Sequence, residues 1–476
     1  MNKLSRQLLL AFAILFTVNV FGQQLVVYPA PTSELDSLHN GDFTVKVRKP
    51  GGQWQDLYEY KVMVDAVRNN NHHVEDASMC AFDFSGSVEV AVTSNRGDVK
   101  TARVRPLSYN IAKEIKGNTV YFKLDRPSNL SIEINGDIFH NLHLFANPLE
   151  TYRVNRNDAS LIYFGPGVHE IPGGVLKIPS GKTVYLAGGA VVKGRLSVSH
   201  AHNVKILGRG IVDFHVVGGL QISNSKHVLV EGIAATQCPT GGSDSVVIRN
   251  VKVFSYYKWG DGMNIFASSD VLFDRVFCRN SDDCNTVYAT RGGYTGNARN
   301  ITMQNSTLWA DVAHPILIGT HGNTPHPDTI ENLKYINLDI LDQNEGQLDY
   351  QGCMAVNVGD NNLARNILFQ DIRVEDIRKG QLVNLRVFYN KKYNTSPGMG
   401  IENVNFRNIT YNGTHAELSI IAGYDDQRLI KNVTFENLNI NGVHIFDKMK
   451  NKPGWYQTSD MARFFVGDHV ENIQFK

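Results

Sequence analysis

The chain has 476 residues, enough to bury a large core and too many for one ordinary compact domain. Its formal net charge is +1, so no broad field attracts nucleic acid or an anionic membrane, and neither is an expected partner. The 41 glycines, 23 Phe and 19 Tyr favour turn-rich β structure over helices.

The N-terminal segment predicts export. Lys3 and Arg6 precede an apolar stretch that ends at Val20, and cleavage is expected near Gly22. This pattern is typical of a secretory signal peptide, here residues 1–23, and the stretch is short for the ~20 residues of a membrane span. We therefore expect a secreted or periplasmic protein without membrane insertion.

The cysteines are odd in number and include no CxxC pair, so they suggest no zinc site. They are Cys80, Cys238, Cys278, Cys284 and Cys353. An exported protein can form a disulfide, and Cys278 and Cys284 are close enough in sequence to pair or to be buried separately. We expect burial as small apolar side chains.

Residues 24–150 alternate apolar and polar side chains over short runs separated by turn signals such as NGD and RPSN. Many short strands at this spacing predict an antiparallel β-sandwich. It carries no evident catalytic cluster, and we expect His72 and His73 to lie in an exposed loop.

Residues 151–476 contain a repeated strand motif, as in NITMQNSTL and NLKYINLDI, with inserts of variable length. The motif begins at residues 203, 227, 245, 270, 300, 332, 366, 403, 432 and 472. Such a repeat predicts a solenoid whose units stack to form one core. Leucine-rich repeats need a shorter, more regular period and propellers need antiparallel blades. The sequence therefore predicts an all-β fold in which a right-handed parallel β-helix follows the sandwich.

The recurrent Asn is expected at turns, where side-chain amides can form a ladder from rung to rung. Asp270, Asp371 and Asp376 are expected to serve as similar turn residues.

The repeat brings acidic residues together in one segment of the solenoid. Asp261 lies 21 residues before Asp282, which is close to one rung, so the two should lie on neighbouring rungs. Asp283 is adjacent to Asp282, and both can face solvent only if the chain turns or bulges there. His314 follows about one rung later on a short apolar run.

Clustered carboxylates cannot all ionise freely, since like charges raise one pKa and leave an acid beside two bases. Glycoside hydrolysis needs that division, because one carboxyl protonates the leaving oxygen while another activates water or attacks the sugar. His314 could hydrogen-bond the acid. Chance turn residues and a Ca²⁺ site are the alternatives that spacing alone leaves open.

The motifs SSDVLFDRVFCRNSDDC and HPILIGTHG resemble glycoside hydrolase family 28, the polygalacturonase family. The order of a sandwich before such a β-helix resembles family 49, the dextranase and isopullulanase family. The resemblance implies that Asp282 is the general acid, that Asp261 and Asp283 position and deprotonate water, and that His314 supports the acid. Both families invert, which implies carboxyl groups about 6.5–9.5 Å apart.

The chain departs from family 28 at two places. Trp259–Gly260 replaces the usual Asn-Thr, and YQGCMAVNVGDNN stands where a basic Arg-x-Lys motif is expected. That basic pair binds galacturonate, so its loss favours a neutral glycan or a differently built anion site. Lys258 and Arg291 are near enough in sequence to supply charge.

Several other residues are candidates for substrate binding. Trp259 is the best candidate for stacking on a sugar ring, and Tyr288 is a second. His321 lies in a loop with His326, and both can line a subsite or simply face solvent.

We expect an inverting glycoside hydrolase that cleaves α-linkages in a polysaccharide or oligosaccharide, either a dextran- or pullulan-like neutral glycan or a pectin-type galacturonan. No cofactor or metal is expected, because carboxylates supply both acid and base, and we expect a monomer. The alternatives are a polysaccharide lyase on the same scaffold and a non-catalytic glycan-binding solenoid.

Overall fold

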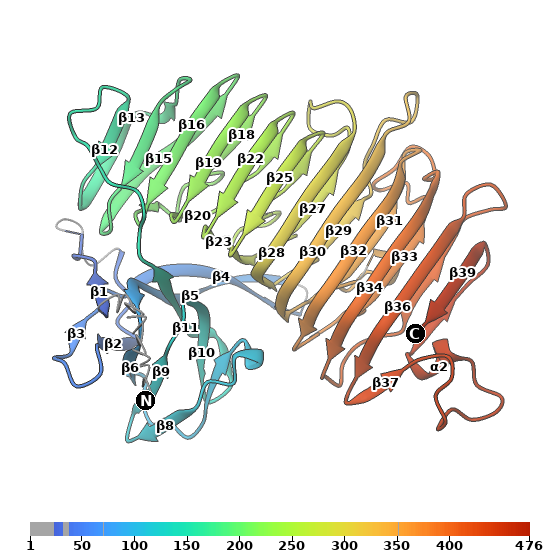
Figure 1. Ribbon diagram of the computed structural model, residues 1–476, viewed down its shortest axis with the longest axis horizontal. Coiled ribbons are helices and arrows are strands. Elements are labelled where there is room, and N and C mark those ends of the chain that lie inside the picture. Colours follow the sequence, from blue (N-terminus) through green and yellow to red (C-terminus); the bar gives the residue numbers. More distant parts are fainter. Residues whose placement is uncertain (1–22, 32–37, 70, 351) are drawn as a thin grey trace, which may run out of the picture.

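The computed structural model describes residues 23–31, 38–69, 71–350 and 352–476. The signal peptide predicted over residues 1–23 lies outside the described residues, apart from residue 23. The described chain folds almost entirely into strands, as two small sheets followed by one long stack of parallel strands (Figure 1). The predicted β-sandwich followed by a parallel β-helix is therefore confirmed. No helix in the described residues is long and apolar enough to cross a membrane.

The N-terminal part consists of a six-stranded and a five-stranded sheet. The first holds β1 (Gln24–Val27), β4 (Tyr60–Arg68), β5 (Asn71–Ser85), β7 (Ala102–Arg105), β10 (Ser128–Ile134) and β11 (Asp137–Pro148). The second holds β2 (Phe43–Arg48), β3 (Gln55–Asp56), β6 (Val88–Ser94), β8 (Lys113–Lys116) and β9 (Thr119–Leu124). Buried and partly exposed residues alternate along β2, as expected for a strand with one face in a core. Phe82, Val90 and Leu144 lie in the core between the sheets.

The β-helix has three faces, because each rung contributes strands that pair with the rungs before and after it. Face A holds β12 (Leu161–Phe164), β14 (Thr183–Leu186), β16 (His202–Gly208), β19 (Lys226–Glu231), β22 (Asp244–Arg249), β25 (Ser269–Asp274), β28 (Ala298–Ala310), β30 (Thr329–Asp342), β32 (Leu363–Val374), β34 (Gly400–Tyr411), β36 (Ile430–Ile440) and β39 (Val470–Phe475).

Face B begins with the strands β13 (Gly167–Lys177), β15 (Ala190–Ser199), β17 (Ile211–Val212), β20 (Ala234–Ala235), β23 (Lys252–Phe254) and β26 (Phe277–Asn280). It continues through the second halves of the long strands β28 to β36. Face C starts from the end of β15 and holds β18 (Leu220–Ser223), β21 (Thr240–Gly241), β24 (Ile265–Phe266), β27 (Asn285–Tyr288), β29 (Ile316–Gly319), β31 (Met354–Val358), β33 (Val383–Val387), β35 (Ser419–Ala422) and β38 (Phe464–Val466).

The C-terminal end adds β37 (Val443–Ile445), antiparallel to β36, and the short helix α2 (Thr458–Met461). Two 3₁₀ turns also lie within the described ranges, at Leu107–Tyr109 and Leu348–Tyr350.

The predicted asparagine ladder is present. The Asn332 Nδ2 donates to Asn300 Oδ1 at 3.2 Å, Asn366 donates to Asn332 at 3.3 Å, and the series continues to residue 472. Asn366 has a φ of 58°, a left-handed conformation that asparagine tolerates better than most residues.

A second ladder lies where faces A and B meet. There Asn337 donates to Asn305 at 2.8 Å, and Asp371 accepts from Asn408 at 2.7 Å. Asp371 therefore serves as the predicted turn residue. The prediction was wrong for Asp376, whose carboxylate accepts a hydrogen bond from Arg103 at 2.8 Å.

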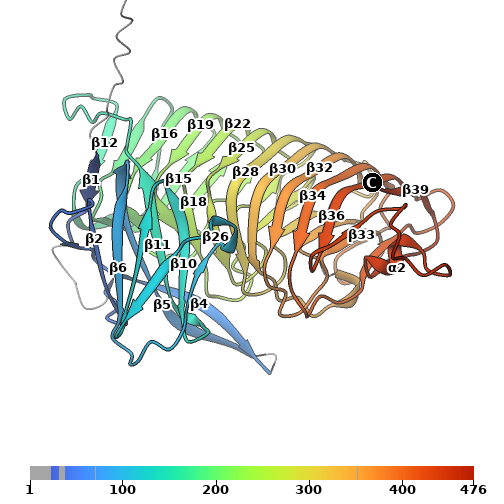
Figure 2. The same cartoon turned by 60° about the horizontal axis from the view of Figure 1, so that its bottom comes forward.

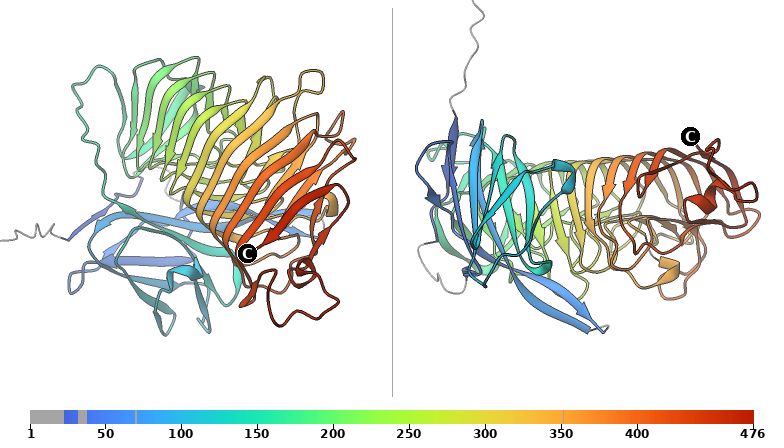
Figure 3. Two further views of the ribbon diagram at one scale, coloured as in Figure 1. Left: turned by 45° about the vertical axis from the view of Figure 1, so that its right-hand side comes forward. Right: turned by 90° about the horizontal axis from the view of Figure 1, so that it is seen from below.

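The sandwich packs against face B. Val62, Val64 and Phe145 share one buried apolar cluster with Phe254 and Phe277 of the β-helix. The hairpin formed by β4 and β5 extends from the sandwich towards the middle rungs (Figures 1 and 2). The sandwich lies beside the first half of the solenoid, and the last rungs extend beyond it (Figure 3).

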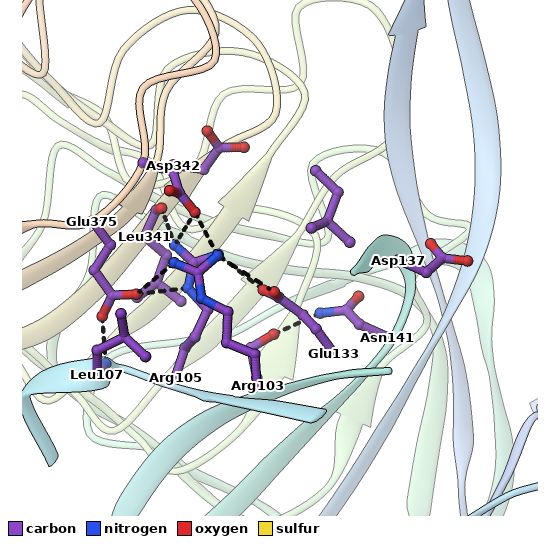
Figure 4. A network of polar contacts seen from close by, with 12 residues as sticks. Arg103, Arg105, Leu107, Glu133, Asp137, Asn141, Leu341, Asp342 and Glu375 are labelled. Carbon is purple, nitrogen blue, oxygen red and sulfur yellow. Dashed lines mark hydrogen bonds and ion pairs between the residues drawn. The ribbon is translucent and has the colours of Figure 1, made fainter. Parts of the chain in front are cut away.

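Buried ion pairs join the two parts. Arg105, which is 1% exposed, donates from Nε to Glu375 at 2.6 Å and from Nη1 to Glu133 at 2.9 Å (Figure 4). Closer to the predicted site, Arg279 of β26 donates to Asp311 at 2.9 Å and to Asn141 of the sandwich at 2.8 Å. Buried charges are tolerated only when paired in this way.

All five cysteines are buried free thiols, which confirms the expectation of burial. Cys278 and Cys284 belong to the core of the β-helix, so their side chains point inwards. The acidic residues between them, Asp282 and Asp283, face the surface or the edge of that core.

Candidate active site

A cavity of about 480 Å³ lies where faces B and C meet. It is lined by loops of successive rungs, which connect β23 to β24, β26 to β27, β28 to β29 and β30 to β31. Of the residues proposed from the sequence, eight contribute to its wall: Lys258, Trp259, Asp261, Asp282, Asp283, Tyr288, Arg291 and His321.

Asp261 lies in the loop between β23 and β24. Its Oδ2 accepts a hydrogen bond from Asn264 Nδ2 at 2.5 Å, and its backbone carbonyl accepts one from Gln237 at 2.5 Å. Burial and the negative charge of Asp283 raise the pKa of Asp261 to about 7, against the opposing influence of Asn264. At neutral pH this carboxyl is therefore poised to take or release a proton.

Asp282 and Asp283 lie where the chain turns between β26 and β27, as expected for two adjacent residues that both reach one site. The Asp283 N–H donates to Asp282 Oδ1 at 3.0 Å, and the Asp283 carbonyl accepts from the Gly262 N–H at 2.8 Å. Burial, followed by the charges of Asp283 and Asp261, raises the pKa of Asp282 well above its ordinary value. Asp282 is thus a carboxyl that holds its proton.

His314 lies behind the cavity wall, in the loop between β28 and β29. Its Nδ1 is 2.7 Å from Asp283 Oδ1, and its Nε2 donates to the Tyr350 carbonyl. Burial opposes protonation of this ring, but the Asp283 charge and hydrogen bond outweigh it and raise the pKa of His314. The resemblance implied that His314 supports the acid Asp282, and the structure pairs it with Asp283 instead.

Two cationic side chains at the rim of the cavity each lie close to an aromatic ring. Lys258 Nζ lies 4.4 Å from the centroid of the Trp259 ring, and Arg291 Cζ lies 5.0 Å from that of Tyr288. The Trp259 side chain is 71% exposed, whereas Tyr288 is almost buried. Trp259 therefore offers an open ring face, as predicted for stacking on a sugar.

Two histidines and one tryptophan near the site differ in burial and in whether they line the cavity. His321 packs edge-on against Tyr288 at 5.1 Å, and burial lowers its pKa to about 4. His326 is exposed in a turn and does not line the cavity. Trp309 is fully buried in contact with Arg279, so it belongs to the interior.

Sequence reasoning missed several residues that line the cavity. From later rungs come Glu345, Gln347, Tyr350, Lys392 and Tyr393. Gln347 Oε1 accepts from Lys392 at 3.2 Å and from Tyr393 at 3.0 Å, which ties two loops together. The sequences of these loops show no repeat pattern. Only counting the rungs after His314 could have indicated that these loops reach the cavity.

His72 of the sandwich also lines the cavity. His72 is exposed, as predicted, but it lies in β5 of the long hairpin that crosses to the β-helix and not in a loop.

No three His, Cys, Asp or Glu side chains among the described residues are grouped so that they could hold a metal ion.

Carboxyl groups with raised pKa values beside a further carboxylate in one cleft are the kind of groups that glycoside hydrolysis requires. The profile of Glycosyl hydrolases family 28 matches residues 196–459, more than half of the chain, and the protein belongs to that family.

The fold is similar to that of Dex49A from Penicillium minioluteum, with a TM-score of 0.61 and 12% identity over 95% of this chain and 96% of that one. It is also similar to a family 28 exopolygalacturonase from Yersinia enterocolitica, with a TM-score of 0.47 and 10% identity over 82% and 96% of the two chains. No curated protein sequence matches.

Proposed function

We propose that the protein hydrolyses α-glycosidic bonds of a polysaccharide with inversion, using Asp282 as general acid and Asp261 with Asp283 as the base that activates water. The observation that carries the proposal is the meeting of these three carboxyl groups in one cavity, two of them with raised pKa values. Pairs of acidic groups with separated pKa values divide the roles of acid and base.

Asp282 protonates the leaving glycosidic oxygen. A carboxyl that stays protonated at neutral pH can donate as the bond to the sugar breaks and an oxocarbenium-like transition state forms. Burial and two negative neighbours keep that proton in place until then.

Asp261 and Asp283 take the proton of the attacking water. Asp283 also accepts two hydrogen bonds from His314, one from the backbone N–H at 3.1 Å and one from the ring at 2.7 Å. The Asp283 charge raises the pKa of both the His314 ring and the Asp282 carboxyl. His314 acts through Asp283 and is a positioning residue.

The substrate that the cavity favours is anionic, of the pectin-type galacturonan class. Lys258, Arg291 and Lys392 line it, and within the described ranges none forms an ion pair with a carboxylate. A uronate carboxylate bound there would supply the missing partner. These loop cations would replace the Arg-x-Lys motif that the sequence lacks.

The N-terminal segment supports the further proposal that the protein is exported to reach such a polysaccharide. N-terminal sequencing of the mature protein from a culture should begin near Gln24 if the signal peptide is removed.

The test is a reducing-sugar assay of the mature protein and its Asp282→Asn variant on polygalacturonate, rhamnogalacturonan, dextran and pullulan, with and without EDTA. We expect turnover of an anionic glycan, unaffected by EDTA and reduced by at least about 10³-fold in the variant. NMR of the products should first detect the sugar anomer whose configuration is opposite to that of the cleaved bond.

Other outcomes identify the alternatives. Unsaturated, ultraviolet-absorbing products that disappear with EDTA would indicate a lyase. Binding without turnover, equal in wild type and variant, would indicate a glycan-binding solenoid. Turnover of dextran or pullulan alone would contradict the anionic substrate but not the hydrolase.

A further inference from the structure

The β4–β5 hairpin of the sandwich is long, and its strands pair from Tyr60 opposite Met79 to Arg68 opposite Asn71. Its length takes it away from the sandwich core and along the β-helix towards the middle rungs (Figure 2). A two-stranded ribbon of this length is marginal alone, so something must hold it in place.

Contacts with face B hold the hairpin. Val62 and Val64 of β4 are fully buried in the cluster that also contains Phe254 of β23 and Phe277 of β26. The next residue along β4, Asp65, is also fully buried and is close enough to Asp311 for their charges to interact. The hairpin is therefore fixed against the rungs that carry Asp282 and His314.

The buried Asp65 fixes the orientation of His72. Its Oδ2 lies 2.5 Å from His72 Nδ1, across the two strands and on the same face of the hairpin. Asp65 side-chain exposure is 0% and that of His72 is 38%, so the pair runs from the interior to the cavity wall. In the tautomer whose Nδ1–H donates to the carboxylate, Nε2 has a free lone pair that can accept a hydrogen bond.

We propose that His72 is a substrate-binding residue, and that its Nε2 accepts a hydrogen bond from a hydroxyl group of the bound glycan. The inference rests on the proposed function, since it takes the cavity to be the glycan site. It makes the sandwich part of that site, so that both halves of the chain determine which sugar fits. A ring held by a buried carboxylate is preorganised, which lowers the entropic cost of binding.

The neighbouring His73 provides the matched control. It pairs with Ala66 on the opposite face of the hairpin and does not line the cavity. His72→Gln retains an N–H that can donate to Asp65, so it keeps the buried carboxylate paired, while it loses the oriented ring nitrogen.

The experiment measures binding by calorimetry, in the full-length mature protein with Asp282→Asn to prevent cleavage. The probes are hexagalacturonate and isomaltohexaose. His72→Gln and His72→Ala should each weaken binding of the recognised oligosaccharide about tenfold, whereas His73→Gln should leave Kd within about twofold. Thermal melting of each variant checks that the hairpin remains folded.

Equal Kd values for the His72 and His73 variants overturn the inference, even if the wild type cleaves polysaccharide. Selective loss of binding in the His72 variants supports it, even if no cleavage occurs and the proposed hydrolysis fails. If neither probe binds the Asp282→Asn protein, the inference is also overturned.

Discussion

The ring of His314 lies 2.7 Å from Asp283 and its backbone N–H donates to the same carboxylate oxygen, so one residue supplies two hydrogen bonds to one side of the acidic cluster. Through its Nε2 the same ring is tied to the loop of the next rung at Tyr350. The position of the Asp283 carboxylate is thus linked to the alignment of two loops, which leads to the first prediction.

His314→Gln should lower kcat by about 10²-fold with little change in KM, because the charge on Asp283 loses its partner while the sugar contacts remain. Steady-state kinetics on the best polysaccharide would measure it. His326→Gln, in an exposed turn outside the cavity, is the control and should be silent. Equal kinetics for the two variants would contradict the role.

The pH profile of kcat/KM should have a rising limb near pH 7. The base must be ionised, and the pKa of Asp261 is about 7, so the rate should rise about tenfold per pH unit below that value. Asp261→Asn should remove this limb together with most of the activity. A wild-type profile that is flat between about pH 5 and 8 would argue against Asp261 as base.

The Asp282→Asn variant should become more stable than the wild type as pH rises. The folded chain binds the Asp282 proton more tightly than the unfolded chain, so the wild type loses this group's contribution to stability as pH rises above about 4, and the variant lacks that loss. Melting should be similar near pH 4 and favour the variant near pH 8. A variant less stable than wild type at alkaline pH would contradict the buried, repelled carboxyl.

Arg105→Ala should destabilise the protein by about 3–5 kcal/mol, because it removes the close partner of buried Glu133 and Glu375 and leaves them only Arg103, at 3.7 Å from each. The comparison is Arg407→Ala, whose ion pair with Glu436 is about half exposed and should contribute less than about 1 kcal/mol. Denaturant unfolding measures both. If the two losses are equal, the interface does not depend on this network.

Trp259→Ala should raise KM about five- to tenfold, with melting temperature unchanged, if its ring stacks on a sugar. Trp455 is 82% exposed but lies in the C-terminal part of the chain, away from the cavity, so Trp455→Ala should change neither quantity. A rise in KM in both variants would point to a general loss of surface contacts.

The repeat made much of the site predictable. Asp261, Asp282 and His314 each lie in a loop after a recognisable strand. Because the strands of a solenoid stack in sequence order, the sequence could predict that these three residues lie close together. Burial of Cys278 and Cys284 followed from their apolar character as small side chains beside predicted strands.

The rest depends on contacts that no local pattern encodes. His72 reaches the cavity only because a hairpin of the sandwich docks on face B, and Asp376 is engaged by Arg103 across the same interface. The partner of His314 was mistaken because adjacent residues at a turn project in different directions, so spacing cannot tell Asp282 from Asp283.

The asparagine ladders run along the start of face A and along its junction with face B, where they hold the rungs in register. The cavity lies at the remaining junction, between faces B and C, and no such ladder joins the described residues of its loops. Loops there can be lengthened, shortened or exchanged without shifting a strand. The architecture thus separates the stacked strands and ladders, which must be inherited unchanged, from the cavity loops, which can diverge. Grafting loops between related enzymes would use that separation.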